Sequence, residues 1–361
     1  MLFNSLEFAL FFPIVAILVL FGPSCCKIAI LFVASCVFYM AFAPGYIVLV
    51  AVTILVAYHA ALCIHKSSGR ARKWYLGIAV TVPCVLLGFF KYWGFLFDNF
   101  ATVTAIIGWQ APDFALDILL PIGISFYTFQ TLSYVIEVYH GRYPPERNLL
   151  VFSTFILFFP QLVAGPIERP QSLLPQFKKP PTFDYERVTS GLRRMALGFF
   201  KKLVVADQLA LYVNDVYGAP QNFNGFQLTL GTIFFAYQIY CDFSGYSDIA
   251  VGASRIMGFR LMENFRSPYH SASVGEFWKR WHFSLSTWFR DYVYIPLGGN
   301  RVGIPRWVVI TLITFGISGL WHGANWTYVV WGLLNGIYLI FGVFTKGVRT
   351  RFWSTLGLHE G

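Results

Sequence analysis

The sequence predicts an all-α membrane protein with many transmembrane helices. Of its 361 residues, 57% are hydrophobic and only 12% are charged, about half the charge of a typical soluble domain. Apolar segments near the length that a bilayer requires, about 20 residues, recur along the chain. The net charge of +10 is concentrated in blocks between these segments, a pattern typical of cytoplasmic loops.

Three apolar segments open the chain, at residues 6–22, 28–42 and 46–64. The first has Glu7 and no Lys or Arg before it, so it lacks the basic start of a secretory signal. We therefore expect it to remain as a membrane helix. Residues 65–73 follow the third segment with four basic residues and no acid, which predicts a cytoplasmic loop.

The fourth segment, residues 75–97, is expected to cross outward, with the long side chain of Lys91 reaching the far surface. No Lys or Arg follows until after residue 141, while several acids occur. This charge pattern predicts an outer loop that carries Asp98, Asp113 and Asp117.

The next apolar runs, residues 114–139 and 149–164, return the chain inward. The second run ends in a proline-rich segment, residues 160–170, through which no regular helix can continue. We expect a broken backbone there whose polar groups are satisfied within the protein. A second basic block, residues 169–202, is expected in the cytoplasm. Its pairs of basic residues within 191–205 predict a helix in the headgroup layer.

Residues 226–258 predict a long helix with a polar middle, which follows an outer loop at 221–225. Asp242 and Asp248 lie in that middle. Carboxylates at membrane depth must face a cavity or pair with partners. The sequence leaves open whether these two form a helix-packing network or contact a substrate.

Residues 275–292 have the periodicity of an amphipathic helix. At about 100° per residue, the large aromatic residues share one face and cations such as Arg280 fall opposite. This pattern predicts an interfacial helix that Trp281 and Trp288 anchor at headgroup level, while its cations meet anionic lipid or a phosphate-bearing donor. His282 lies at the edge of the aromatic face.

Residues 307–320 and 326–344 predict a membrane hairpin with both ends in the cytoplasm. From residue 307 to 345 the sequence has no Asp, Glu, Lys or Arg and one histidine, His322. A histidine can take and return a proton near neutrality, and an ionisable group at membrane depth is functional by default. The alternative is a neutral histidine that ties the two helices together by a hydrogen bond.

Several chemistries lack their motifs. The six cysteines form no CxxC pair, which argues against a disulfide framework or a zinc site. There is no nucleotide-binding loop, GxSxG elbow or HExxH pair, and the basic residues flank membrane segments rather than forming a nucleic-acid-binding domain. A histidine base without a protein nucleophile suits a substrate hydroxyl as nucleophile, and a basic inner face suits an anionic donor such as an acyl thioester. A transporter or flippase for the donor or glycan also fits broken helices.

Four motifs resemble those of a known family. They are FFPQLVAGPIER (residues 158–169), CDFSGYSDIAVG (241–252), FWKRWHFSLSTWFRDY (277–292) and GLWHGANW (319–326). In this order they are similar to the membrane-bound O-acyltransferases (MBOAT), in particular to the bacterial branch that O-acetylates alginate and other cell-envelope polysaccharides. The resemblance implies a ring of tilted transmembrane helices around a thinned centre, with re-entrant and interfacial helices, an outer funnel and an inner donor tunnel.

The resemblance also implies site residues. His322 matches the catalytic histidine of the family, and His282 matches its second functional histidine. As substrate-binding residues we expect Asp242, Asn325, Trp321 and Arg280. We expect neither a metal nor a bound cofactor.

The implied activity moves an acyl group, acetyl above all, from a cytoplasmic thioester across the bacterial inner membrane. The donor would be acetyl-CoA or an acyl carrier protein, and periplasmic partner proteins would place the group on the polysaccharide. We expect one domain, residues 1–361. Because members of this branch usually continue with further membrane helices, we expect a partial chain or one in which those helices are dispensable.

Overall fold

The computed structural model describes residues 1–109, 119–163, 165–179 and 181–355, and each regular element within these ranges is a helix. The all-α prediction is confirmed. Of the expected outer loop, Asp98 is described, whereas Asp113, Asp117 and residues 114–118 of the following segment lie outside the described residues.

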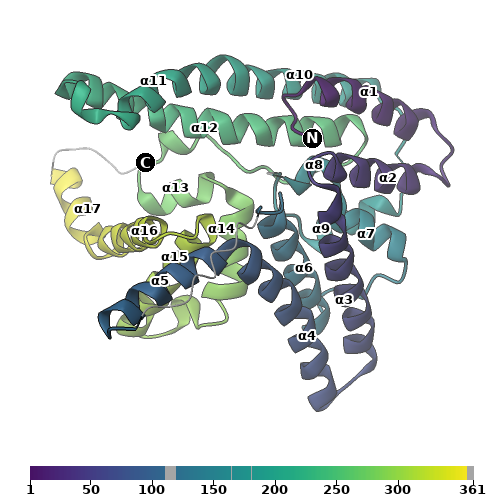
Figure 1. Ribbon diagram of the computed structural model, residues 1–361, viewed down its shortest axis with the longest axis horizontal. Coiled ribbons are helices and arrows are strands. Elements are labelled where there is room, and N and C mark those ends of the chain that lie inside the picture. Colours follow the sequence, from purple (N-terminus) through teal and green to yellow (C-terminus); the bar gives the residue numbers. More distant parts are fainter. Residues whose placement is uncertain (110–118, 164, 180, 356–361) are drawn as a thin grey trace. The chain divides into compact units, whose positions relative to one another are not determined.

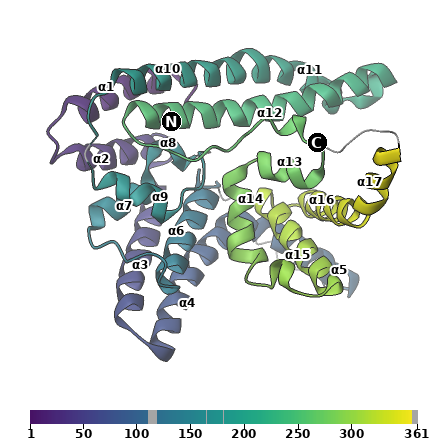
Figure 2. The same ribbon diagram turned by 180° about the vertical axis from the view of Figure 1, so that it is seen from behind.

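The chain forms two compact units, unit 1 (Met1–Leu87 with Leu120–Asn264) and unit 2 (Gly88–Leu119 with Phe265–Gly361). The single domain therefore stays a prediction. The helices of unit 1, labelled in Figures 1 and 2, are α1 (Leu6–Phe21), α2 (Lys27–Met40), α3 (Ile47–Lys66), α4 (Gly69–Leu87), α6 (Ile124–Tyr139), α7 (Leu149–Leu157), α8 (Phe159–Leu162), α9 (Pro170–Phe177), α10 (Tyr185–Phe199), α11 (Asp207–Gly218) and α12 (Gly225–Ile256).

Unit 2 holds the predicted hairpin and the segment that was expected to form one amphipathic helix. Its helices are α5 (Trp93–Ile106), α13 (Val274–Arg280), α14 (Phe283–Phe289), α15 (Ile304–His322), α16 (Trp326–Phe344) and α17 (Lys346–Thr355). Two π-helical turns belong to it, η2 (Gly88–Tyr92) before α5 and η6 (Arg290–Tyr294) after α14.

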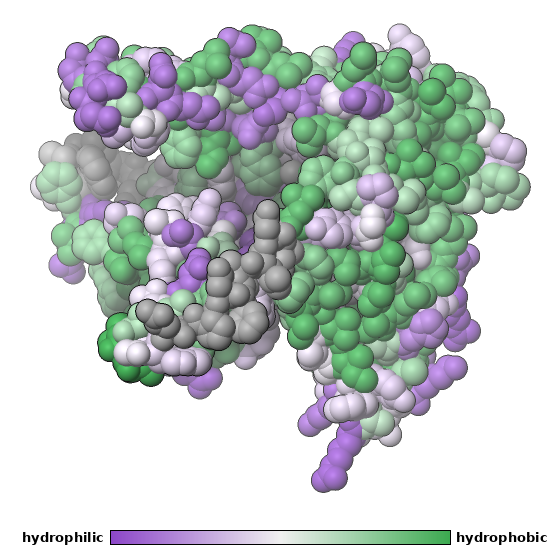
Figure 3. All heavy atoms as spheres, viewed as in Figure 1, coloured by the Kyte–Doolittle hydropathy of each residue, from purple (hydrophilic) through white to green (hydrophobic). Residues whose placement is uncertain are grey.

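Four helical segments among the described residues are long and apolar enough to cross a membrane: Pro44–Lys66, Gly69–Ile106, Ile304–His322 and Trp326–Phe344. The shorter helices α1 and α2 are also apolar. Figure 3 shows a hydrophobic flank on the α3–α4 hairpin and hydrophilic side chains at its tip, where the basic loop 65–73 lies. The chain is a membrane protein, and the inside and outside positions of its loops stay predictions.

The first helix break lies at Phe158, between α7 and α8, two residues before the proline-rich segment in which it was expected; α8 then ends within that segment, at Leu162. The carbonyl oxygen of Phe155, which the break deprives of its helical partner, accepts from Gln130 Nε2 at 2.6 Å and Gln161 Nε2 at 2.8 Å. The amide of Phe159 donates to Ser35 Oγ at 3.2 Å. Buried side chains thus satisfy the broken backbone, as the sequence predicts.

Helices α10 and α12 pack closely through glycine. A Cβ added at Gly198 would lie 2.7 Å from the carbonyl oxygen of Gly245, and one at Gly252 would lie 2.7 Å from that of Gly191. The two glycines of each helix are seven residues apart, which places them on one helix face. Small residues at such positions let helix backbones approach, and both views show α10 and α12 side by side.

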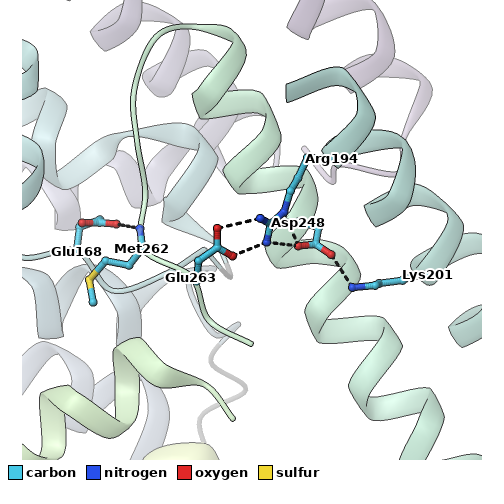
Figure 4. Close-up of polar contacts among 6 residues, drawn as sticks. All are labelled: Glu168, Arg194, Lys201, Asp248, Met262 and Glu263. Carbon is cyan, nitrogen blue, oxygen red and sulfur yellow. Dashed lines mark hydrogen bonds and ion pairs between the residues drawn. The ribbon is translucent and has the colours of Figure 1, made fainter. Parts of the chain in front are cut away.

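Because of this packing, basic residues of α10 and of the following π-helical turn η3 (Phe200–Ala206) meet partners on α12. Oδ1 of Asp248 accepts from Arg194 Nη2 at 2.7 Å, and Oδ2 accepts from Lys201 Nζ at 2.7 Å. Arg194 also donates to Glu263 (Figure 4). A buried carboxylate thus binds both Arg194 and Lys201. The position of this helix in the headgroup layer stays a prediction.

Candidate active site

The hairpin of α15 and α16 ends in a short, ordered tip. His322 is the last residue of α15, and Gly323 is extended, with φ −161° and ψ 147°. Asn325 then caps α16, because its Oδ1 accepts from the amide and the hydroxyl of Thr327, both at 2.9 Å. The tip therefore holds His322 between two fixed helix ends.

His322 is half-buried among aromatic rings. Its ring centroid lies 5.1 Å from that of Trp321 and 5.0 Å from that of Trp331, both in edge-on geometry. Its Nδ1 lies 2.7 Å from the carbonyl oxygen of Ser318. Because a carbonyl oxygen only accepts, Nδ1 carries the proton and Nε2 has a free lone pair. This is the arrangement of an imidazole base.

His282 interrupts the segment that the sequence predicts as one helix. It stands between α13 and α14 in the left-handed region, with φ 43° and ψ 55°. A residue other than glycine in this region is strained, and such strain is characteristic of functional sites. The prediction of one continuous helix over 275–292 is therefore wrong. The sequence did not reveal the break because the aromatic residues keep their helical periodicity through it.

The aromatic face of this segment lies inside the unit. Trp281 and Trp288 are buried, and Trp281 packs edge-on against Phe265 at 5.1 Å between ring centroids. The prediction that these tryptophans anchor at headgroup level is wrong, since packing within unit 2 covers them.

His282 is 1% exposed, and its ring centroid lies 6.2 Å from that of Trp321. The indole of Trp321 thus lies near both His282 and His322. Burial, and to a lesser extent His322, lowers the pKa of His282 well below its usual value. His282 is therefore neutral near pH 7.

A cavity of about 400 Å³ lies within unit 2. Residues of α15 line it from Trp307 through Thr311 and Thr314 to Ser318, all on one face of that helix. Helix α14 and η6 also line it, with hydroxyls, phenyl rings and the cation Arg290, and α13 contributes Lys279. The cavity therefore runs from the end of α15 that was predicted cytoplasmic to the residue that hydrogen-bonds His322.

Residues 144–356 match the family model of the membrane-bound O-acyltransferases. The chain belongs to this family. It is thus an acyltransferase, and the resemblance carried by its four motifs is confirmed.

Curated relatives of this MBOAT protein include the probable alginate O-acetylases AlgI of Pseudomonas putida and Pseudomonas aeruginosa. Both are 41% identical to it over 94% of the chain, which spans 70% and 65% of their lengths. The peptidoglycan O-acetyltransferase of Helicobacter pylori is 35% identical over 86% of the chain and 63% of its own length.

Of the four expected substrate-binding residues of this MBOAT protein, one lies near both histidines and the other three have local partners. Trp321 lies near both histidines, whereas Asn325 caps α16 and Arg280 forms an ion pair with Glu276 at 2.5 Å. Asp242 belongs to unit 1, where its carboxylate lies 2.5 Å from Lys202 Nζ. Local contacts therefore explain the positions of Asn325, Arg280 and Asp242, and substrate contacts by these residues remain predictions.

Three residues around His322 were not anticipated. Ser318 could have been found from its spacing, one helical turn before the histidine. Trp331 and Lys91 gave no local signal, because their proximity to His322 depends on the packing of α16 and η2. Instead of reaching the membrane surface as predicted, Lys91 donates from η2 to the carbonyl oxygen of Trp321.

Proposed function

We propose that this chain is an O-acetyltransferase of the bacterial inner membrane that serves the O-acetylation of an extracytoplasmic polysaccharide such as alginate. It would take the acetyl group from a cytoplasmic thioester, acetyl-CoA or an acetylated acyl carrier protein. The names of its relatives support acetyl as the group and a cell-envelope polymer as the destination. The observation that carries the proposal is the cavity that reaches Ser318, the hydrogen-bond partner of His322.

The chemistry of the cavity supports a thioester donor. Lys279 and Arg290 suit the phosphates of an anionic donor, and the hydroxyls of Thr311 and Thr314 suit the amides of a pantetheine arm. Its volume of about 400 Å³ falls in the range of small-molecule sites, roughly 300–1,000 Å³. The thioester would enter at the Trp307 end of the cavity, which was predicted cytoplasmic, and present its carbonyl carbon near His322.

In the proposed reaction, His322 acts as general base. Nε2 takes the proton of the acceptor hydroxyl while Nδ1 stays bonded to Ser318, and the oxygen attacks the thioester carbonyl carbon. The tetrahedral intermediate collapses as the C–S bond breaks, and the thiolate takes the proton from Nε2. The products are the acetyl ester and the free thiol, with the imidazole restored.

His282 and Trp321 would shape this site. Because His282 is buried and neutral, it cannot serve as a charged proton donor in the reaction. We therefore assign it to orienting the indole of Trp321 or the substrate beside it. On the outer side, periplasmic proteins would receive the acetyl group and place it on the polymer.

The test is turnover of radiolabelled acetyl-CoA by the purified chain in proteoliposomes, with acetylated acyl carrier protein as the alternative donor. We expect CoA release that disappears in His322→Ala. Thr314→Trp should fill the cavity and raise KM for the donor, while Thr345→Trp, at the end of α16 and outside the cavity lining, serves as the control. Uptake of intact acetyl-CoA without cleavage would instead support a transporter.

A further inference from the structure

The π-helical turn η2 contacts the end of α15 through two consecutive residues. Lys91 Nζ donates to the carbonyl oxygen of Trp321, and the hydroxyl of Tyr92 donates to that of Leu320 at 2.9 Å. The ammonium of Lys91 also lies 5.3 Å from the ring centroid of Trp321. Since π-helical turns are rare in proteins overall but often occur at functional sites, this contact points to a role in the reaction.

The two carbonyl groups need partners because of how α15 ends. The last carbonyls of a helix lack intrahelical donors, and the extended backbone at Gly323 leads the chain away from the helix axis. The amide of Asn325 bonds to Gly323 instead, at 3.0 Å. These carbonyls also carry the partial negative charge of the helix dipole, which a cation such as Lys91 stabilises.

The same helix turn carries the proposed base. Ser318, whose carbonyl oxygen orients Nδ1, precedes Leu320 by two residues, and His322 follows Trp321 directly. Lys91 is also near enough to His322 for an electrostatic interaction with it. A displacement of this turn would therefore move the imidazole relative to the cavity.

We propose that Lys91 is a positioning residue of the acyl transfer, which fixes the last turn of α15 and places a positive charge beside His322. The proposal rests on the proposed function. As the acceptor hydroxyl loses its proton, negative charge develops next to the imidazole. A cation already held in place by Trp321 stabilises that charge without reorganisation. The hydroxyl of Tyr92 adds an uncharged hydrogen bond to the same turn.

Three variants separate the effect of the Lys91 charge from that of the hydrogen bonds between η2 and the last turn of α15. Lys91→Met keeps the length of the stem but loses the ammonium, Lys91→Arg keeps the charge, and Tyr92→Phe loses only the neutral hydrogen bond to Leu320. We expect kcat for acetyl-CoA turnover to fall about ten- to a hundredfold in Lys91→Met with KM nearly unchanged. We expect Lys91→Arg to restore most of it and Tyr92→Phe to lose only a few-fold. Equal losses in Lys91→Met and Tyr92→Phe, or full activity of Lys91→Met, would overturn the proposal.

Hydrogen exchange in residues 319–326 provides a readout without turnover. We expect faster exchange in Lys91→Met than in the unmodified chain and protection in Lys91→Arg. If the unmodified chain turns over no acetyl-CoA, the proposed function fails, and exchange alone then decides about Lys91. Unchanged exchange in Lys91→Met would overturn its positioning role, whether or not the chain is active.

Discussion

Nδ1 of His322 lies 2.7 Å from the carbonyl oxygen of Ser318, one turn earlier on the same helix. This contact fixes the tautomer of the imidazole, since the carbonyl can only accept. It also orients Nε2 away from the helix backbone. The sequence alone left two interpretations of His322 open, a proton carrier or a tie between the helices. The hydrogen bond lies within α15 and does not connect it to α16, so the structure gives no support to a tie of that kind.

We predict that His322→Asn abolishes transfer while the protein still folds. The amide nitrogen of asparagine can take the place of Nδ1 and donate to Ser318, but no base remains at the position of Nε2. General-base catalysis contributes on the order of 10²–10⁴-fold, so activity should fall by that factor. Thermal unfolding in detergent should change little. Near-normal activity would make His322 a structural residue, and the base would have to be sought at His282 or Asp242.

The two aspartates of α12 should respond differently to removal of their charge. The side chain of Asp248 is 8% exposed and binds both Arg194 and Lys201, whereas that of Asp242 is 51% exposed and pairs with Lys202. Loss of one partner from a buried ion pair costs about 3–5 kcal/mol, while an exposed pair contributes about 1 kcal/mol or less.

Asp248→Asn should therefore lower the unfolding temperature and the yield of folded protein far more than Asp242→Asn. The measurement is thermal unfolding of both variants in the same detergent. Equal stability losses would contradict this assignment. If Asp242→Asn retains stability but raises KM for the acceptor or donor, the predicted substrate contact of Asp242 gains support.

Glu168 should make the stability of unit 1 depend on pH. Its side chain is fully buried and accepts from the amide of Met262 (Figure 4). Burial raises the pKa of Glu168 to about 7, compared with about 4.3 for an unfolded glutamate. Between these values the folded protein keeps a proton that the unfolded chain releases. Stability therefore falls as the pH rises through this window and is level above it, with a total change of about 4 kcal/mol.

We predict that Glu168→Gln, which cannot titrate, removes this slope between pH 5 and 7 when thermal unfolding is followed in detergent. Glu276→Gln is the matched control. The hydrogen bond from the Ala272 amide lowers the pKa of the half-buried Glu276 carboxyl. The stability that Glu276 contributes is therefore complete above the usual carboxyl pKa range and is lost only at lower pH. A parallel pH dependence in Glu168→Gln and the unmodified chain would refute the assignment.

The sequence predicts those parts of the fold that depend on local pattern. The hairpin around His322 follows from two apolar runs and the Gly323–Asn325 turn, and the break near Pro160 follows from proline chemistry. Membrane depth could be inferred for His322 because no Asp, Glu, Lys or Arg accompanies it from residue 307 to 345. In each case the deciding residues are neighbours in sequence.

What the sequence does not reveal depends on contacts between distant segments. The break at His282 leaves the aromatic periodicity intact, and the attachment of Lys91 to Trp321 joins residues 230 positions apart. For the α10–α12 packing a signal was present: Gly191 and Gly198 have the same spacing as Gly245 and Gly252. This spacing aligns the two helices so that Asp248 meets Arg194 and Lys201.

The α15–α16 hairpin should depend on a second close approach of backbones, at Gly332. A Cβ at this position would lie 2.3 Å from the carbonyl oxygen of Phe315, while one at Gly316 would meet nothing nearer than a Leu333 methyl at 3.4 Å. Overpacking costs about 1–3 kcal/mol even where side chains can adjust, and a backbone carbonyl cannot move without moving α15. Gly332→Ala should therefore separate the helices near Gly319 and lower both the unfolding temperature and acetyl-CoA turnover. Gly316→Ala, on the same hairpin, should leave both nearly unchanged. If Gly332→Ala were as stable and active as Gly316→Ala, the hairpin would not require this close contact, and the position of His322 would have to be fixed by other contacts, Lys91 first among them.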